Sequence, residues 1–116
     1  MVEASTAWAL EPMVLNLAGY HYKNAYLLKH WAATQAGRPP KDRLVERAEC
    51  FFFEALFVNP NDYSGLNGLG SVLTFERELE AAEFFIRRAI ALVEQDGIDY
   101  APAKHDLATI LAFKQG

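Results

Sequence analysis

The sequence predicts an all-α protein, and three observations carry that prediction. Long segments place apolar residues at spacings of three and four, which is the period of one helix face. No segment sustains the strict apolar–polar alternation of a half-buried strand. A set of apolar residues also recurs 34 positions later: Ala48, Phe51, Phe52, Ala55 and Leu56 return as Ala82, Phe85, Ile86, Ala89 and Ile90. A period of this length is typical of helical units that bury their apolar faces by stacking on neighbours.

The first helix is predicted to run from about Pro12 to Ala36. This segment contains no further proline and carries a set of residues at spacings of three and four, most of them apolar or aromatic: Leu17, Tyr20, Asn24, Leu27, Leu28 and Trp31. Pro12 is expected in the first turn, because a missing N–H group costs nothing there. Residues 37–41 contain one glycine and two prolines, so they should end the helix.

The second and third helices are predicted from residue periodicity and from their caps. The second should span about Arg43–Val58, with Asp42 as its N-cap. Residues 59–62 have the composition of a tight turn, since they contain two asparagines, a proline and an aspartate. The third helix should span about Tyr63–Phe75, with Asp62 as its N-cap.

The fourth helix is predicted over Leu79–Gln95 and should stop at Asp96 and Gly97, because glycine accepts the left-handed conformation that ends a helix. Asp99 is expected to cap a fifth helix that reaches about Lys114. This last helix repeats the third after 38 positions, so four extra residues should lie in the fourth helix or in the turn after it. Four residues add about one helical turn and preserve the facing of the units.

Composition excludes several classes of function. The net charge is −4, and the eleven Lys and Arg residues are spread along the chain, which argues against a nucleic-acid binder. A single cysteine, Cys50, excludes an internal disulfide and indicates a reducing compartment. Its aromatic neighbours favour a packing role for it, with a reactive thiol as the alternative. Neither a secretory signal nor a membrane span is evident, so we expect a soluble, cytoplasmic protein that does not contact membranes.

The third and fourth segments together carry a spaced set of large and small residues: Leu66, Leu69, Gly70, Leu73, Ala82, Ile86 and Ala89. This spacing resembles the tetratricopeptide repeat, and the second segment supplies Ala48, Phe52, Ala55 and Pro60 in the matching places. Leu66 stands where the family usually has Trp, Leu73 replaces the usual Tyr, and Lys104 occupies a position for a large apolar residue. The resemblance therefore supports the repeat class and no named subfamily.

The resemblance implies a right-handed stack of antiparallel helix hairpins, an α-solenoid, preceded by a long N-terminal helix. Residues 1–116 would form one domain with an N-terminal helical extension (1–24), a divergent repeat (25–60), the clearest repeat (61–97) and a half repeat (98–116). Small residues are required where the two helices of a hairpin come closest. The alanines at these positions should therefore be buried: Ala48, Ala55, Ala82 and Ala89.

In the resembling family, the first helix of each repeat lines a concave groove that holds a peptide or helix of a partner. Carried onto this chain, the binding residues would be Ser64, Asn67, Ser71, Thr74, His105, Thr109 and Phe113, with Lys29 from the first helix. The resemblance thus implies a protein–protein interaction module that binds another protein or peptide and needs no cofactor or metal.

The alternative function is oligomerisation or assembly. The chain ends after half of its last repeat, which should leave the side formed by Leu107, Ile110 and Leu111 without a covering helix. Either a second copy covers that face and forms a homodimer, or the chain is part of a longer repeat protein.

Other groups of residues have simpler explanations than chemistry. Gly65, Gly68 and Gly70 lack the context of a phosphate loop; we interpret Gly70 as a close helix contact, and Gly65 and Gly68 as leaving room for a ligand on the exposed side. The three histidines, His21, His30 and His105, show no paired-ligand spacing. Four acidic residues enrich the start of the fourth helix in negative charge, which the helix dipole favours there: Glu76, Glu78, Glu80 and Glu83. Glu83 should also pair with Arg87, four residues later. No catalytic set is found, so we do not expect an enzyme.

Phe51, Phe52 and Phe53 cannot all face one core. Phe53 and Phe57, four residues apart, should form a second apolar stripe on the second helix. Packing of this stripe under the long first helix is the favoured interpretation, and an exposed patch for a partner is the alternative.

Overall fold

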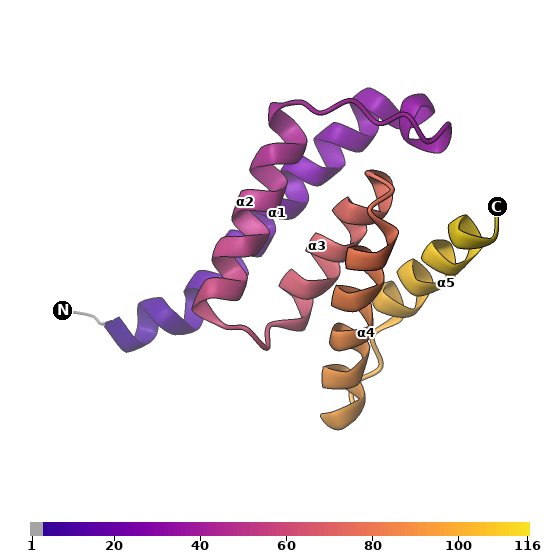
Figure 1. Cartoon of the computed structure of the whole chain (residues 1–116). Helices are drawn as coiled ribbons and strands as arrows, with labels where there is room; N and C mark the ends of the chain where they lie inside the picture. The colour runs from indigo at the N-terminus through magenta and orange to yellow at the C-terminus, as the bar shows by residue number, and fades with distance from the viewer. Residues whose placement is uncertain (1–3) are drawn as a thin grey trace.

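The computed structural model describes the backbone of residues 4–116 and the side chains from residue 11 onward. Within this range the chain forms α-helices and no strand: α1 (Ala4–Gln35), α2 (Arg43–Val58), α3 (Tyr63–Phe75), α4 (Leu79–Gln95) and α5 (Ala101–Gln115) (Figure 1). The all-α class is therefore confirmed. The predicted bounds of α2, α3 and α4 agree with the structure.

The prediction for the start of α1 was wrong. The helix begins at Ala4, so Pro12 lies inside it and not in its first turn. The residues before Pro12 include Ala and Leu, which are strong helix formers, and the helix continues past the one hydrogen bond that proline removes. The backbone of α1 departs from helical geometry at His30, with φ −122° and ψ 25°, and this residue marks a kink.

The helix ends bear out most of the predicted caps. The Asp42 carboxylate accepts hydrogen bonds from the backbone N–H groups of Leu44 (2.9 Å) and Val45 (3.3 Å), as expected of an N-cap. Gly97, which follows α4, has φ +69°, the left-handed conformation expected there. The prediction for Asp99 was wrong, because Tyr100 is the residue that precedes α5.

The four extra residues of the second repeat divide between α4 and its turn. Leu92 is the repeat equivalent of Val58, the last residue of α2, and α4 continues three residues beyond it to Gln95. The turn before α5 is one residue longer than the turn before α3. Both predicted locations therefore take part of the insertion.

Helices that are consecutive in sequence pack against each other, and α3 also contacts α1 and α5. In Figure 1, α1 and α2 lie side by side and run in opposite directions, while α3 occupies the centre of the molecule. The buried residues form two clusters, both of which include α3. One joins α1, α2 and α3, and contains Tyr26, Val45, Ala48, Phe52, Leu69 and Val72. The other joins α3, α4 and α5, and contains Leu66, Ala82, Ile86, Ala89, Ala103 and Ile110.

The four repeat alanines, Ala48, Ala55, Ala82 and Ala89, are all fully buried, as predicted. Ile110 is also fully buried against this second cluster. The expectation that its side of α5 lacks a covering helix was therefore wrong for Ile110, although Leu111 is exposed.

Glycines allow α3 to approach its neighbours closely. A Cβ atom placed on Gly70 would lie 2.5 Å from the Cδ1 atom of Ile86, which confirms the expected close contact with α4. A Cβ atom on Gly68 would lie 2.8 Å from Cδ1 of the Phe52 ring, and closer still to its Cε1 and Cζ atoms. Gly65 and Gly68 are both buried, so the expectation that they leave room for a ligand on an exposed side was wrong.

Phe53 and Phe57 are exposed, so the favoured packing of these rings under the first helix was wrong. Phe52 points into the core from the same helix, and its neighbours at positions 53 and 57 are therefore turned away from α1.

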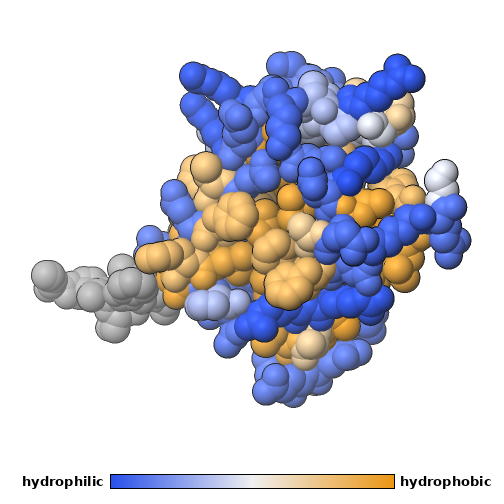
Figure 2. Space-filling view, viewed as in Figure 1, coloured by the Kyte–Doolittle hydropathy of each residue, from blue (hydrophilic) through white to orange (hydrophobic). Residues whose placement is uncertain are grey.

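Cys50 is exposed as well, which contradicts the packing role expected for it. Figure 2 shows a band of apolar surface across the face on which α2 lies in this view.

Candidate functional site

A pocket of about 310 Å³ opens between three helices that are far apart in sequence, and we call it the α1–α3–α5 pocket. It is lined by Trp31, Gln35, Ser71, Thr74, Phe75, His105, Asp106, Thr109 and Phe113. Five of the eight residues expected to bind a partner therefore line one cavity: Ser71, Thr74, His105, Thr109 and Phe113. The contacts of α3 with both α1 and α5 bring the three helices together around it.

The walls of this pocket combine aromatic rings with hydroxyl groups. The guanidinium of Arg77 stacks over the Phe113 ring at 3.7 Å from its centroid. Two threonine hydroxyls donate to carbonyls of their own helices: Thr74 to Gly70 (2.8 Å) and Thr109 to His105 (3.2 Å). Their hydrogens are thus engaged within the helix, and each oxygen can still accept a hydrogen bond from a ligand.

Two ionisable residues of opposite charge interact at the pocket: Lys23 of α1, and Asp106 of α5, which is one of the lining residues. The Lys23 ammonium is 3.5 Å from the Ser71 hydroxyl and lies over the Tyr20 ring at 4.9 Å from its centroid. Burial lowers the pKa of Lys23, and the charge of Asp106 opposes this change. Burial likewise raises the pKa of the Asp106 carboxyl, while Lys23 and His105 act in the opposite direction. Each charge therefore stabilises the other in a partly desolvated setting.

Asn67 does not line the pocket. Its side chain is buried beneath α1, where its amide group donates to the Tyr20 hydroxyl at 3.4 Å. Its Oδ1 atom has no hydrogen-bond partner among the residues that the structure describes. Asn67 thus contributes to the contact between α1 and α3, and a ligand in the pocket would not touch it directly.

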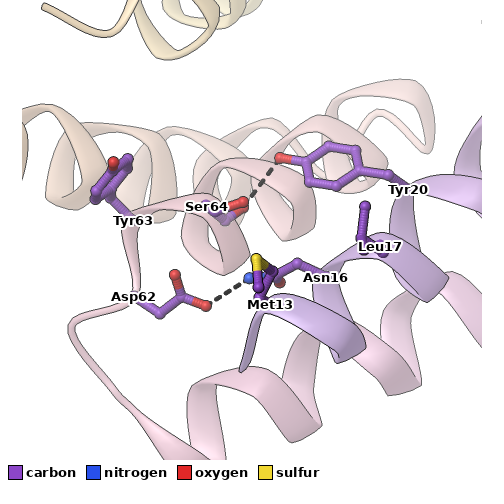
Figure 3. Close-up of a pocket in the computed structure, with 7 residues that line it drawn as sticks. All are labelled: Met13, Asn16, Leu17, Tyr20, Asp62, Tyr63 and Ser64. Carbon is purple, nitrogen blue, oxygen red and sulfur yellow. Dashed lines mark hydrogen bonds between the residues drawn. The ribbon is translucent and has the colours of Figure 1, made fainter. Parts of the chain in front are cut away.

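Ser64 lies in a different cavity, of about 260 Å³, at the start of α3. It is lined by Met13, Asn16, Leu17, Tyr20, Asp62, Tyr63 and Ser64 (Figure 3). The backbone carbonyl of Ser64 accepts a hydrogen bond from the Tyr20 hydroxyl (3.0 Å), and the Asn16 amide donates to Asp62 (2.6 Å). Asp62 occupies the predicted N-cap position, but its carboxylate is directed to α1 through this bond.

Lys29 also lies outside the α1–α3–α5 pocket. Its exposed ammonium is 3.8 Å from the Asp42 carboxylate, which also accepts a hydrogen bond from the His30 ring at 2.7 Å. Burial raises the pKa of Asp42, but hydrogen bonds from His30 and from two backbone N–H groups outweigh it and lower the pKa overall. Lys29 and His30 therefore connect α1 to the first turn of α2.

Sequence reasoning missed Trp31, Gln35, Phe75 and Asp106 among the pocket residues. Asp106 could have been found, because it precedes Thr109 by three residues and Phe113 by seven, which places all three on one face of α5. Trp31 carried no such signal, since its spacing fits a buried helix face equally well.

A further ionisable cluster lies between α2 and the end of α3. The buried carboxylate of Glu76 is 2.9 Å from the Lys41 ammonium. Because α3 ends at Phe75 and α4 begins at Leu79, Glu76 directly follows α3, and its assignment to the start of the fourth helix was wrong. Burial, followed by the charge of Glu76, raises the pKa of the Glu49 carboxyl from 4.5 to about 7, while Lys41 opposes the shift. Glu83 does pair with Arg87 as predicted, at 2.6 Å.

A raised pKa in the folded state has a defined effect on stability. The stability that the fold gains from protonated Glu49 is fully present below the unfolded pKa of 4.5 and is lost as the pH rises through about 7. The fold is therefore expected to lose stability between these two pH values as Glu49 becomes charged beside Glu76.

Among the side chains that the structure describes, no group of three His, Cys, Asp or Glu residues could hold a metal ion. In the same part of the chain, no helix has the length and apolar character that crossing a membrane requires. Comparison with protein-family models, with curated proteins and with solved structures gives no match for this chain. What the pocket can bind follows from its own lining, which offers aromatic faces, hydroxyl oxygens and one carboxylate.

Proposed function

We propose that this chain is a tetratricopeptide-like repeat module that binds a short segment of another protein in the α1–α3–α5 pocket. The observation that carries the proposal is the shared pocket of Ser71, Thr74, His105, Thr109 and Phe113. These residues were selected from the resemblance to the tetratricopeptide repeat, as the groove-facing positions of the first helix in each hairpin; in the structure Ser71 and Thr74 line the pocket from buried positions. The order and pairing of the helices support a solenoid-like arrangement, in which α1, α3 and α5 are those first helices.

The chemistry of the pocket favours a peptide segment as its occupant. Trp31 and Phe113 present aromatic surfaces for an apolar side chain, and the oxygen atoms of Thr74 and Thr109 can accept hydrogen bonds from peptide N–H groups. The volume lies at the lower end of the range for ligand pockets, which is enough for one or two side chains. Affinity in the micromolar range, about 8 kcal/mol, is therefore expected.

The test is a selection of binding peptides from a displayed random library, followed by titration of the best peptide into the purified chain. The Thr109→Arg variant should abolish binding, because the longer side chain fills the pocket. A matched variant, Phe57→Arg, adds the same side chain at an exposed position of α2 outside the pocket and should bind normally. Circular dichroism of both variants checks that the helices are intact.

Two results would contradict this function. One is a library that yields no peptide with at least millimolar affinity. The other is a peptide that binds the Thr109→Arg variant as tightly as the unmodified chain, since binding would then occur elsewhere on the surface.

A further inference from the structure

The cavity at the start of α3, which we call the Ser64 cavity, contains a carboxylate without a cationic partner. One oxygen of Asp62 accepts the hydrogen bond from Asn16, and the carboxylate makes no capping bond to the backbone of α3 (Figure 3). Asp62 forms no ion pair with any Lys, Arg or His that the structure describes, whereas Asp42 is paired with Lys29. A ligand that carries a positive charge would supply the missing partner.

The Asn16 side chain holds this carboxylate in place. Asn16 is only 5% exposed, and its amide donates to Asp62 at 2.6 Å. The Oδ1 atom of Asn16 is buried and has no hydrogen-bond partner among the described residues. Both side chains thus add acceptor oxygens to the cavity, which favours an occupant that donates hydrogen bonds. The first turn of α3 carries about half a positive charge, which is smaller than the full negative charge of Asp62.

The other walls of the Ser64 cavity fit the stem of a long basic side chain. Met13 and Leu17 present exposed apolar groups of α1, and Tyr20 and Tyr63 present aromatic rings. Lysine and arginine place their methylene stems along apolar surface and keep the charged end at a polar group. An aromatic face such as that of Tyr63 also attracts the cation. At about 260 Å³ the cavity is below the usual range for ligand pockets, so it suits a single side chain.

The residues that line the Ser64 cavity and the α1–α3–α5 pocket share one face of α3. With about 100° between successive residues, Ser64, Ser71 and Phe75 fall within an arc of about 40°. α1 runs beside α3 in the same direction, because Tyr20 bonds to Ser64 and Lys23 to Ser71. The two cavities therefore lie at successive positions along the same pair of helices.

The distance between the cavities sets a spacing for an extended segment. Ser64 and Thr74 are ten residues apart, which is about 15 Å along the helix axis. An extended chain advances about 3.3 Å per residue. Two side chains four or five residues apart in such a segment can therefore reach the two cavities.

We propose that the Ser64 cavity is a second subsite that binds a lysine or arginine side chain of the segment held in the α1–α3–α5 pocket. Asp62 accepts the charged end, and the stem lies against Met13 and Leu17. The segment is then recognised by one apolar side chain and by one basic side chain four or five residues away. This inference rests on the proposed function.

Parallel selections from a displayed library of random peptides of about twelve residues, enough to span both cavities, test the subsite. Peptides selected on the unmodified chain should carry Lys or Arg four or five positions from an aromatic or aliphatic residue. Selection on Asp62→Asn should lose this basic position, because asparagine keeps the shape and can still accept the Asn16 bond but has no charge. The control is Glu46→Gln, which removes one charge at an exposed site outside both cavities and should retain the basic position.

A double-mutant cycle with the tightest selected peptide measures the contact itself. Exchange of its basic residue for norleucine should weaken binding to the unmodified chain about fivefold, as expected for a partly exposed ion pair. The same exchange should have no effect on binding to Asp62→Asn.

Leu17→Lys is a second variant, which leaves Asp62 in place. Its ammonium competes for the carboxylate, so binding of the basic peptide should weaken about fivefold. Leu28→Lys makes the same change at an 87% exposed residue of α1 outside both cavities and should bind normally.

The inference is overturned by selected peptides without a basic position, by retention of that position on Asp62→Asn, or by equal effects of norleucine on both proteins. If Thr109→Arg abolishes binding in these cases, the proposed function still stands. If instead binding tolerates Thr109→Arg but depends on Asp62, the basic subsite is supported and the proposed function is contradicted. A library without any binding peptide overturns both.

Discussion

Gly68→Ala should lower the free energy of unfolding, although alanine is the better helix former. At an unrestricted position in a helix, the exchange would stabilise the protein by about 1 kcal/mol. Gly68, however, lies directly against the Phe52 ring, and a Cβ atom there would be 2.8 Å from Cδ1 and closer to two further ring atoms. Ordinary contact between carbon atoms begins at about 3.5 Å, so the ring or the helix must move.

The ring has little room to move. The same three ring atoms also lie against Gly19 of α1, where a Cβ atom would be 2.6 Å from Cε1 of Phe52. Tyr20 packs edge-on against the same ring, with 4.9 Å between centroids. Overpacking in a well-packed core costs about 1 to 3 kcal/mol, and we take the upper value because Gly19 and Tyr20 of α1 confine the ring. After the gain in helix propensity, the expected net loss is about 2 kcal/mol.

Urea denaturation followed by far-UV circular dichroism measures this loss. Adding Phe52→Leu to Gly68→Ala should restore part of the stability lost, because a smaller side chain relieves the overlap, and the two changes should therefore be non-additive. A Gly68→Ala variant that is as stable as the unmodified chain, or more stable, would refute the close packing of α1, α2 and α3 around Phe52.

Two further predictions concern ionisable residues of α2 and its cap. Glu49→Gln should leave the free energy of unfolding nearly unchanged at about pH 4.5 and raise it by about 1 kcal/mol at about pH 8.5. This gain is smaller than a pKa shift from 4.5 to about 7 gives for a fully buried carboxyl, because solvent screens a half-exposed side chain. Denaturant titrations at both pH values check this, and an equal effect at both would disprove the proton linkage. Asp42→Ala removes the N-cap of α2 and the acceptor for His30, so it should destabilise the protein by about 1 to 2 kcal/mol. Thermal unfolding measures the change, and an unaltered melting temperature would exclude a stabilising role for this cap.

Much of the fold could be predicted from the sequence because the repeat specifies local structure twice. The burial of Ala82 and Ala89 followed from their equivalence to Ala48 and Ala55, and the end of α4 followed from Gly97. The errors arose where periodicity identifies an apolar face but not what covers it. Phe57 belongs to a regular apolar stripe, yet the packing of α1 against the other side of α2 leaves it exposed.

The part of the candidate site that could be predicted is the part that depends on which side chains share one face of a helix. Ser71, Thr74, Thr109 and Phe113 could be placed together because α3 and α5 repeat one pattern. The share contributed by α1 could not be predicted, since it depends on the tertiary position of a helix outside the clear repeat. Trp31 is the main example.

The three glycines of α3 affect the order in which the chain can fold. Together they weaken the intrinsic helix propensity of this segment by about 2 to 3 kcal/mol, so α3 has little tendency to be helical alone. The same bare backbone admits Phe52 from α2 and Ile86 from α4. The central helix is thus held by its neighbours, and we expect it to become ordered only when the flanking helices dock, which makes the two halves of the molecule fold as one cooperative unit.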